Sequence, residues 1–359
     1  MACPTSQKHI RNRAGCEYMP WLRRASPYQL SCRDRKWWGE ILSSRTRPSA
    51  GYIARMEHRA VPCAPTDYKS VFRFWLYALS EMRQDCPVTA FDLRHEDCVA
   101  GMQTLPANIV DLVVTSPPYN LGIRYSKFSD RADRAGYLYW CKTWATEIAR
   151  LLKANGSFFL NVGASPANPM FPHQIVLELR DLFVLQNTIH WIKSISIKEK
   201  NGKTVSYGHF KPVSSKRYLN DCHEYIFHFT KTGRVEIDRL AIGVPYQDKT
   251  NISRWSHTRG SDLRCRGNTW FIPYETIQSR AKERPHPATF PVRLAELCIK
   301  LHGASPVETM LDPFLGIGNS AVAAQKCGVR KFIGFEIDET YLAEAKRRIE
   351  RNHAIASQT

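Results

Sequence analysis

The pattern of apolar and polar positions changes along the chain. Residues 1–81 show no sustained period of 2 or 3.6 residues, so no fold is predicted for them. At 108–162 and again at 307–349, short apolar runs alternate with helix-like patterns, which is typical of strands joined through helices. The patterns therefore predict one α/β domain at 82–359, with a doubly wound, largely parallel sheet covered by helices on both faces.

The clearest of these units spans residues 307–338. It reads as a strand, a loop containing Gly316 and Gly318, a helix, and a second strand that ends at Glu336. Glycines allow a tight turn and a close approach of the backbone to a ligand. Glu336 follows the loop by about 20 residues, a spacing that suits a carboxylate accepting hydrogen bonds from ribose hydroxyls. An ordinary β-α connection and a dinucleotide site use the same unit.

A second motif follows the apolar run at 111–115, which stops abruptly at Ser116-Pro117-Pro118-Tyr119. Consecutive prolines end a strand, fix φ and lack an N–H, so the Ser116 hydroxyl and the carbonyls of Ser116 and Pro117 are possible acceptors. Acceptors aimed at an amine on a flat ring favour the positively charged nitrogen that forms as the amine attacks a methyl donor. Tyr119 would stack on that ring. Taken alone, the motif also fits a rigid structural turn.

Together the two motifs favour S-adenosylmethionine over a nicotinamide dinucleotide as the ligand. The third glycine of a Gly-x-Gly-x-x-Gly loop is replaced by Ala321, and Asp312-Pro313-Phe314 precedes the loop. Alanine is tolerated at that position, so the spacing alone decides little. The motif at 116–119 supplies the stronger argument, because its acceptors fit methyl transfer to an amine.

In residues and in order, these motifs resemble those of the DNA amino-methyltransferases that act on cytosine N4 or adenine N6. The resemblance is to the β arrangement of that family, in which Ser/Asp-Pro-Pro-Tyr precedes Phe-x-Gly-x-Gly, and it extends from Val88 to Arg351. Further landmarks in the family's order are 96–98, 150–156 before a strand at 157–162, and 286–291 opening a helix to 301. The resemblance implies the S-adenosylmethionine-dependent methyltransferase fold and that cofactor.

The resemblance also implies a role for each matching residue. The residues implied to hold the target base are Ser116, Pro117, Pro118 and Tyr119. The implied cofactor-binding residues are Asp97, His286, Pro287, Asp312, Phe314, Gly316, Gly318, Asn319 and Glu336, and no metal site is expected. Asp97 would lie near the adenine ring, Glu336 at the ribose, and His286 beside the methionine moiety. Two alternatives stay open: Asp97 could cap a turn, and Asp312 could orient the loop without touching the cofactor.

The residue at position 116 bears on the target base. Ser116 resembles the cytosine N4 enzymes, whereas Asp at this position is typical of the adenine N6 enzymes. The base would be flipped out of the duplex at a cost of a few kcal/mol, offset by stacking and by phosphate contacts. Adenine N6 methylation is the alternative, followed by RNA methylation and by a catalytically silent DNA-binding relative.

The charge balance supports a polyanionic partner. Lys and Arg number 51 against 33 Asp and Glu, a formal charge of +18, which suits electrostatic capture of DNA. Basic residues gather at 193–285, so we expect target recognition at 194–285, around an apolar strand at 223–229. Residues 121–139 carry basic and aromatic side chains suited to a loop that closes over base and cofactor, although a solvated surface loop has the same composition.

The cysteine content and the lengths of the apolar runs indicate where the protein acts and with which partners. The odd count of eleven cysteines and the absence of Cys-x-x-Cys predict reduced thiols rather than a zinc site, with Cys98, Cys141, Cys298 and Cys327 in the core. Because no apolar run reaches the length of a membrane span, we expect a cytoplasmic protein of a prokaryotic cell. The expected partner is double-stranded DNA, with a cognate restriction endonuclease if the chain serves restriction-modification. The expected assembly is a monomer or a homodimer.

The first 81 residues call for a separate expectation. They hold 14 Lys and Arg against 6 Asp and Glu, a net of +8, with four tryptophans and scattered prolines. We expect either a disordered basic extension or a misassigned start, because Met82 stands where the family-like sequence begins.

Overall fold

The computed structural model describes residues 89–120, 132–208, 210, 214–250, 252–255, 258, 261–273, 289–303 and 307–356. The chain divides into two units, Met1–Glu81 and Met82–Thr359, and every described residue belongs to the second. The expectations for 1–81, for His286 and Pro287, and for residues 121–131 of the closing loop expected at 121–139 therefore lie outside the described residues. The end of that expected loop is helical instead, because a helix begins at Arg134 with Asp133 as its N-cap.

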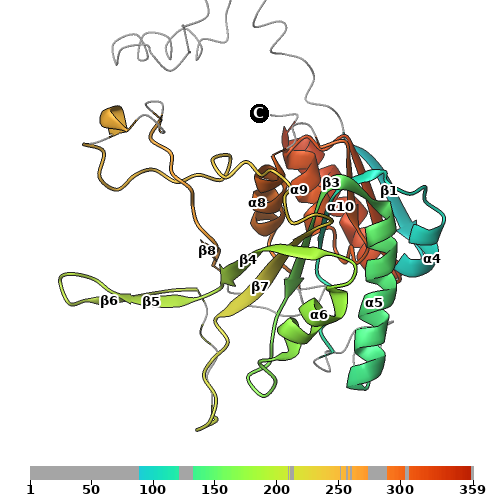
Figure 1. Cartoon of the computed structure of the whole chain (residues 1–359), viewed down its shortest axis with the longest axis horizontal. Helices are drawn as coiled ribbons and strands as arrows, with labels where there is room; N and C mark the ends of the chain where they lie inside the picture. The colour runs from blue at the N-terminus through green and yellow to red at the C-terminus, as the bar shows by residue number, and fades with distance from the viewer. Residues whose placement is uncertain are drawn as a thin grey trace, which may run out of the picture. The chain divides into compact units, whose positions relative to one another are not determined.

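A mixed, mostly parallel sheet runs through the described part of the chain, with the strand order β1-β10-β9-β2-β3-β7-β4-β8 (Figure 1). The strands are β1 (Ala90–His95), β2 (Val110–Thr115), β3 (Leu152–Val162), β4 (Val184–Ile192), β7 (His223–Thr230), β8 (Thr269–Phe271), β9 (Thr309–Asp312) and β10 (Lys331–Glu336). Strand β7 runs antiparallel to its neighbours β3 and β4, and the other pairs are parallel. The predicted doubly wound, largely parallel sheet is confirmed.

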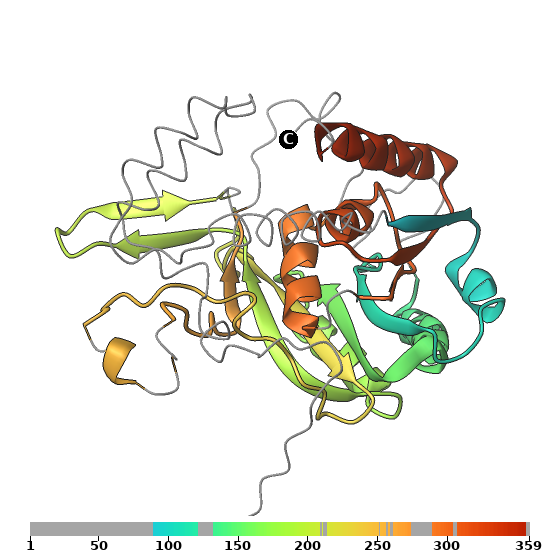
Figure 2. The ribbon, with the colours of Figure 1, turned by 90° about the horizontal axis from the view of Figure 1, so that it is seen from above.

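Helices cover both faces of this sheet (Figure 2). The side chains of its strands alternate between the two helical layers. One layer contains α4 (Cys98–Gln103), α5 (Arg134–Leu151) and α6 (Phe171–Leu179), and the other contains α8 (Val292–His302), α9 (Asn319–Lys326) and α10 (Glu339–Ala356). On β2, Leu112 and Val114 pack with α8 and α9, while Val113 packs with α5. Successive strand residues point to opposite faces, so a fully apolar strand is what a sheet between two layers requires.

Two element boundaries differ from the prediction. Strand β3 begins at Leu152 rather than at 157, because Leu152 pairs with Val110 at the start of β2. Helix α8 begins at Val292 rather than near 286, with Pro291 at its N-cap in an extended conformation. A residue before proline is disfavoured in the helical region, so the sequence before Pro291 is a poor place for a helix to begin.

A second, smaller sheet is an antiparallel hairpin of β5 (Ile195–Lys198) and β6 (Thr204–Tyr207), which projects from the main sheet (Figure 1). It lies between β4 and β7 in the chain. The short 3-10 helix η2 (Ile252–Arg254) belongs to a long segment between β7 and β8 that contains little regular structure. The predicted strand at 223–229 corresponds to β7, so the basic segments on either side of it leave from opposite ends of this strand.

The described cysteines are free thiols. Cys98, Cys141 and Cys298 are buried, as predicted, and Cys327 is half-buried. Burial raises the pKa of the Cys141 thiol to about 12 and that of the other two buried thiols further, so all three are poor nucleophiles. Within the described residues, no group of three or more His, Cys, Asp or Glu could hold a metal ion, and no helix is long and apolar enough to cross a membrane.

Candidate active site

The carboxyl ends of four adjacent strands place the predicted motifs at one edge of the sheet. Strands β1, β10, β9 and β2 are parallel neighbours, so the loops that follow them leave the sheet on the same side. Those loops carry Asp97, Asp338, Gly316 and Ser116. This edge is where open α/β sheets bind their ligands.

Asp312, at the end of β9, ties two of these strand ends together. Its carboxylate is fully buried and accepts hydrogen bonds from Thr115 Oγ1 at 2.5 Å, Ser320 Oγ at 2.5 Å and the Phe314 N–H at 3.0 Å. Burial raises the pKa of Asp312 to about 6, although the hydrogen bonds oppose that shift. The side chain lies behind the loop and is not among the residues that line the cavity described below. The structure thus matches the alternative in which Asp312 orients the loop.

The glycine loop needs glycine for its backbone conformation. Gly316 and Gly318 have φ of 53° and 79°, in the left-handed region that disfavours other residues. A Cβ on Gly318 would also lie 2.8 Å from the Cβ of Ala345 on α10. Gly318 forms the N-cap of α9 and does not line the cavity, whereas Gly316 does.

Glu336, at the end of β10, holds the other side of this loop. Its Oε2 accepts from the Gly316 N–H at 2.8 Å and its Oε1 accepts from the Asp338 N–H at 2.9 Å. Burial raises the pKa of Glu336 above its ordinary value. Because a carboxylate oxygen has more than one acceptor site, Glu336 can brace the loop and still accept hydrogen bonds from a ligand in the cavity it lines.

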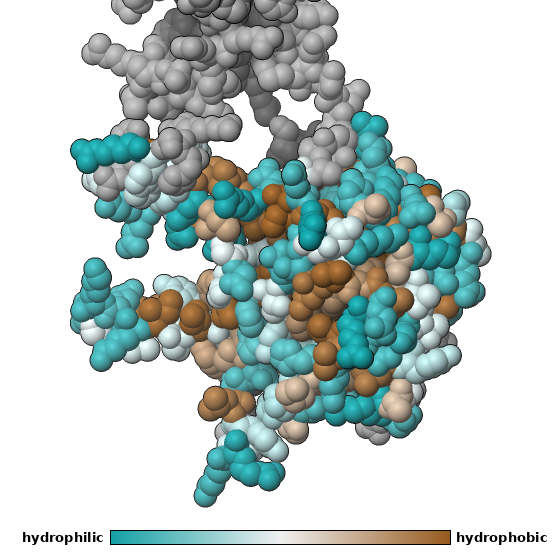
Figure 3. Space-filling model, viewed as in Figure 1, coloured by the Kyte–Doolittle hydropathy of each residue, from teal (hydrophilic) through white to brown (hydrophobic). Residues whose placement is uncertain are grey.

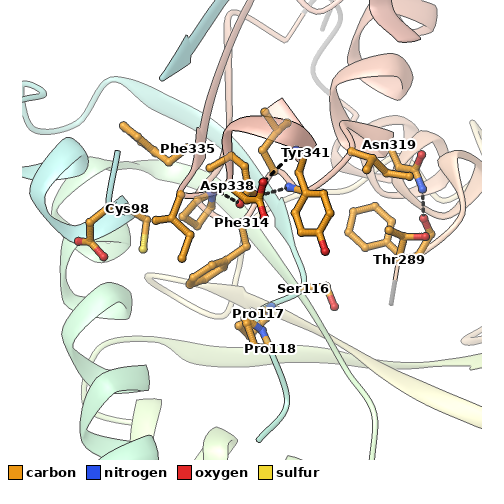
Figure 4. Close-up of a pocket in the computed structure, with 18 of the residues that line it drawn as sticks. Cys98, Ser116, Pro117, Pro118, Thr289, Phe314, Asn319, Phe335, Asp338 and Tyr341 are labelled. Carbon is orange, nitrogen blue, oxygen red and sulfur yellow. Dashed lines mark hydrogen bonds between the residues drawn. The ribbon is translucent and has the colours of Figure 1, made fainter. Parts of the chain in front are cut away.

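These loops enclose a cavity that brings most of the predicted site residues together (Figure 4). Its described lining consists of residues 96–98, 116–119, Trp140, Glu224, 289–290, 313–317, Asn319, 335–338 and Tyr341. Nine predicted residues are among them: Asp97, Ser116, Pro117, Pro118, Tyr119, Phe314, Gly316, Asn319 and Glu336. The site has two sides: the loop side, residues 313–319 and 335–338, and the serine side, residues 116–119 with Asn161, Lys193 and Glu224.

Asp97 has a capping role as well as a place in the lining. Its Oδ1 accepts from the Val99 N–H at 2.9 Å and from the Ala100 N–H at 3.1 Å, which makes it the N-cap of α4. Asp, Ser, Thr and Asn are favoured there because they satisfy free N–H groups of the first helical turn. The cap that the sequence left open as an alternative is therefore present.

The shape and polarity of the cavity fit the predicted cofactor. Cys98 and Phe335 lie at one end and Asn319 and Thr289 at the other, with Ser116 below the middle (Figure 4). The first pair offers apolar surface to a purine. Asn319 Nδ2 donates to the Phe290 carbonyl at 2.5 Å, and its buried Oδ1 has no hydrogen-bond partner among the described residues. A donor such as the amino group of a methionine moiety would satisfy that oxygen.

Phe314 connects the loop side to helix α5. Its ring centroid lies 5.4 Å from that of Trp140 and 5.5 Å from that of Trp144. Such tilted and edge-on ring pairs contribute beyond the area that they bury. On the same helix, Tyr137 donates its hydroxyl to the Pro118 carbonyl at 2.5 Å. Helix α5 thereby holds both sides of the cavity, a role that the sequence alone did not predict.

The serine side contains a compact hydrogen-bond network. Ser116 Oγ lies 2.7 Å from the Tyr119 hydroxyl, which donates to Glu224 Oε2 at 3.0 Å. Asn161 Nδ2 donates to the Tyr119 hydroxyl at 2.7 Å and to Glu224 Oε2 at 2.8 Å. Lys193 Nζ pairs with Glu224 Oε1 at 3.1 Å. The sequence prediction missed Asn161, Lys193 and Glu224, and the available signal was a charged residue inside the otherwise apolar strand at 223–229.

Comparison with known proteins identifies what this arrangement resembles. A family model described as DNA methylase matches residues 110–347. The type II methyltransferase M.ScaI of Streptomyces caespitosus is 29% identical over 273 residues, 72% of this chain and 81% of that protein. The DNA adenine methyltransferase YhdJ of Escherichia coli (strain K12) is 28% identical over 284 residues, 75% of this chain and 87% of that protein.

The fold is shared with a solved methyltransferase structure. The PvuII DNA methyltransferase (cytosine-N4-specific) aligns with a TM-score of 0.53 at 18% identity, covering 76% of this chain and 94% of the other. At that identity, the likeness concerns the arrangement of strands and helices. The chain therefore shares the fold of that methyltransferase.

Proposed function

Because the chain belongs to the family of DNA methyltransferases that modify cytosine N4 or adenine N6, we propose that it methylates the exocyclic N4 of cytosine at a specific sequence in double-stranded DNA. Methylation of DNA with S-adenosylmethionine as cofactor follows from the family. The target base is the proposal, and one observation carries it. Ser116, the residue at which the resemblance distinguishes the two bases, lines the same cavity as the glycine loop and Glu336.

The chemistry needs placement rather than a protein nucleophile. S-adenosylmethionine supplies a methyl group bonded to a positively charged sulfur, which an amine can attack directly. Ser116 Oγ and the carbonyls of Ser116 and Pro117 would accept the hydrogens of the base amine and favour the positive charge that develops on its nitrogen. The aromatic ring of Tyr119 would stack on the flipped base, which offsets the cost of removing it from the duplex.

Phe314 and Glu336 would hold the cofactor. Phe314, fixed between Trp140 and Trp144, gives the loop side a rigid apolar wall. Glu336 would accept hydrogen bonds from the ribose hydroxyls, and Oδ1 of Asn319, which has no partner in the described part of the chain, would accept one from the amino group. Fixing both reactants in one cavity converts a bimolecular reaction into an intramolecular one, which is a large part of what such a site can contribute.

Recognition of the sequence is assigned to residues 194–285 within the methyltransferase domain at 82–359. The β5–β6 hairpin stands clear of the main sheet, and its tip is hydrophilic (Figure 3). Lys198, Lys200 and Lys203 are exposed at this tip. Ser196, Ser206 and Thr204 lie with Lys198 on one face of the hairpin, because residues paired across an antiparallel ladder share a face. A two-stranded ribbon fits the major groove, where hydroxyls and ammonium groups can read base edges.

The likeness to type II methyltransferases supports a biological setting. M.ScaI and M.HpaI of Haemophilus parainfluenzae carry that description. The proposed setting is a restriction-modification system in the cytoplasm of a prokaryotic cell, with a cognate restriction endonuclease as the functional partner. The proposed assembly is a monomer or a homodimer.

Identification of the methylated nucleoside tests the proposal. The full chain is incubated with methyl-labelled S-adenosylmethionine and duplex DNA of mixed sequence, and the digested nucleosides are analysed by mass spectrometry. Labelled N4-methylcytosine is the expected product. Labelled N6-methyladenine, the product that the name of YhdJ implies for that relative, would support DNA methylation but overturn cytosine as the target base. If the protein binds S-adenosylmethionine but the digest contains no labelled nucleoside, the proposed DNA methylation activity is wrong.

A further inference from the structure

The Ser116 hydroxyl begins a chain of hydrogen bonds that ends on a carboxylate. Ser116 contacts the Tyr119 hydroxyl, and the Tyr119 hydroxyl donates to Glu224 Oε2. We propose that Glu224 finally accepts the proton that the base amine loses on methylation, through the hydroxyls of Tyr119 and Ser116. The inference rests on the proposed methylation of an amine, and it holds for cytosine N4 and for adenine N6 alike.

The direction of the hydrogen bonds favours a relay. Because the Tyr119 hydroxyl gives its hydrogen to Glu224, its oxygen can only accept from Ser116 Oγ and from Asn161 Nδ2. Ser116 has a second possible acceptor in the Asn161 carbonyl, at 3.2 Å, and Asn161 Nδ2 lies 3.4 Å from Ser116 Oγ. Either way the Ser116 hydrogen points away from the base, which leaves an oxygen lone pair to accept from the amine.

The surroundings of Glu224 suit a negatively charged acceptor. Its side chain is 15% exposed and pairs with Lys193, whose side chain is 22% exposed. A buried carboxylate without a partner would be costly, and the ammonium of Lys193 offsets that cost. Two further charged or titratable groups face this carboxylate, Asp221 and His223, and burial raises the pKa of Asp221 and lowers that of His223. The chain of hydrogen bonds from Ser116 through Tyr119 to Glu224 does not pass through Asp221, which suits it as a control.

The step balances without an added reactant. The amine lone pair forms the N–CH₃ bond as the S–CH₃ bond breaks, and the electrons of that bond stay on sulfur. The nitrogen then carries a positive charge and releases a proton to Ser116 Oγ. Ser116 passes its own hydrogen to Tyr119, and Tyr119 passes its hydrogen to Glu224 Oε2. The products are a neutral methylated base, two intact hydroxyls and a protonated Glu224, with no oxidation or reduction.

The relay is tested by single-turnover methylation as a function of pH, on a preformed complex of the full chain with DNA. Glu224→Gln keeps the size of the side chain and removes its charge, and Tyr119→Phe keeps the ring and removes the hydroxyl. We expect each to slow methyl transfer by about 10²-fold, in the range of general acid–base effects. We also expect the natural chain to lose rate at acidic pH and Glu224→Gln to show no such loss. Asp221→Asn should keep both the rate and its pH dependence.

Each other outcome overturns the relay. If Glu224→Gln transfers methyl groups as fast as the natural chain, the Glu224 carboxylate does not accept the proton. If Glu224→Gln transfers methyl groups slowly but its rate still falls at acidic pH, Glu224 only positions Tyr119 and does not accept the proton. Thermal unfolding of the variants separates a damaged fold from a damaged relay, and Tyr119→Phe gives an independent result if Glu224→Gln unfolds. An N6-methyladenine product would overturn the proposed base and leave the result for the relay standing.

Discussion

The loop side and the serine side of the cavity are built in different ways. On the loop side the hydrogen bonds of Glu336 hold the loop backbone within one β-α-β unit, as when Glu336 accepts from the Gly316 N–H, 20 residues away. On the serine side they cross the sheet, as when Tyr119 donates to Glu224, 105 residues away. The loop side is a backbone structure that glycine makes possible, whereas the serine side is an assembly of side chains. A side-chain change on one side should therefore leave the other intact.

The largest effect on methyl transfer is expected from Ser116→Ala. The change removes an acceptor for the base amine and the partner of the Tyr119 hydroxyl. Methyl transfer should slow by about 10²- to 10³-fold, as when one hydrogen-bonding group is removed from a preorganised site. Single-turnover methylation measures the rate, and calorimetry should show unchanged affinity for S-adenosylmethionine. Thr146→Ala, on the exposed side of α5, is the control. Loss of cofactor binding in Ser116→Ala would contradict the separation of the two sides.

Gly318→Ala should damage the loop side through the backbone. Its free energy of unfolding should fall by about 2–4 kcal/mol, from left-handed strain together with crowding against Ala345. Gly267→Ala is a matched control, since Gly267 has a φ of 83° and open space where a Cβ would stand. The free energy of unfolding of that variant should fall only by the cost of the left-handed conformation, about 1–2 kcal/mol. Urea denaturation compares the two, and equal losses would mean that contact with α10 does not shape the loop.

Glu336→Gln should weaken cofactor binding about tenfold, because hydrogen bonds to a charged acceptor are stronger than those to a neutral amide. Burial raises the pKa of Glu336, so the natural carboxylate takes up a proton at a higher pH than an ordinary Glu. Affinity for S-adenosylmethionine should therefore decline as the pH falls, and the decline should be absent in Glu336→Gln. Calorimetry across a range of pH gives the affinity of both proteins and its pH dependence. If the affinity of Glu336→Gln changes with pH as that of the natural chain does, Glu336 does not take part in cofactor binding.

The smallest effect per side chain is expected on DNA affinity, from the exposed lysines of the β5–β6 hairpin outside the cavity. Replacing Lys198, Lys200 and Lys203 with Ala should make the dependence of DNA affinity on salt shallower by about 3 in its logarithmic slope, roughly one unit per phosphate contact. Fluorescence anisotropy with duplex DNA measures the slope. Lys346→Ala, on an exposed position of α10, should leave it unchanged. An unchanged slope in the triple variant would place the hairpin away from the DNA.

The same contrast explains which parts of the site the sequence could predict. The loop side follows from a local pattern, in which apolar runs, glycines and a terminal acid stand in order within 307–338. Glu224 and Asn161 were missed because they meet Tyr119 only when β7 pairs with β3, and no local pattern shows that pairing. Asp312 shows a further limit. The resemblance implied a cofactor contact for it and left open a role in orienting the loop, and only the structure shows that its partners Thr115 and Ser320 turn its carboxylate into the core.

A double-mutant cycle on Ser116→Ala and Glu336→Gln tests the separation of the two sides most directly. The measured quantity is kcat/KM for S-adenosylmethionine at saturating DNA, which reports changes in binding and in methyl transfer together. If the sides act independently, the two losses in transition-state free energy should add to within about 0.5 kcal/mol. A coupling of about 1 kcal/mol or more would contradict the account, because it would mean that the glycine loop and the serine network hold one another in place.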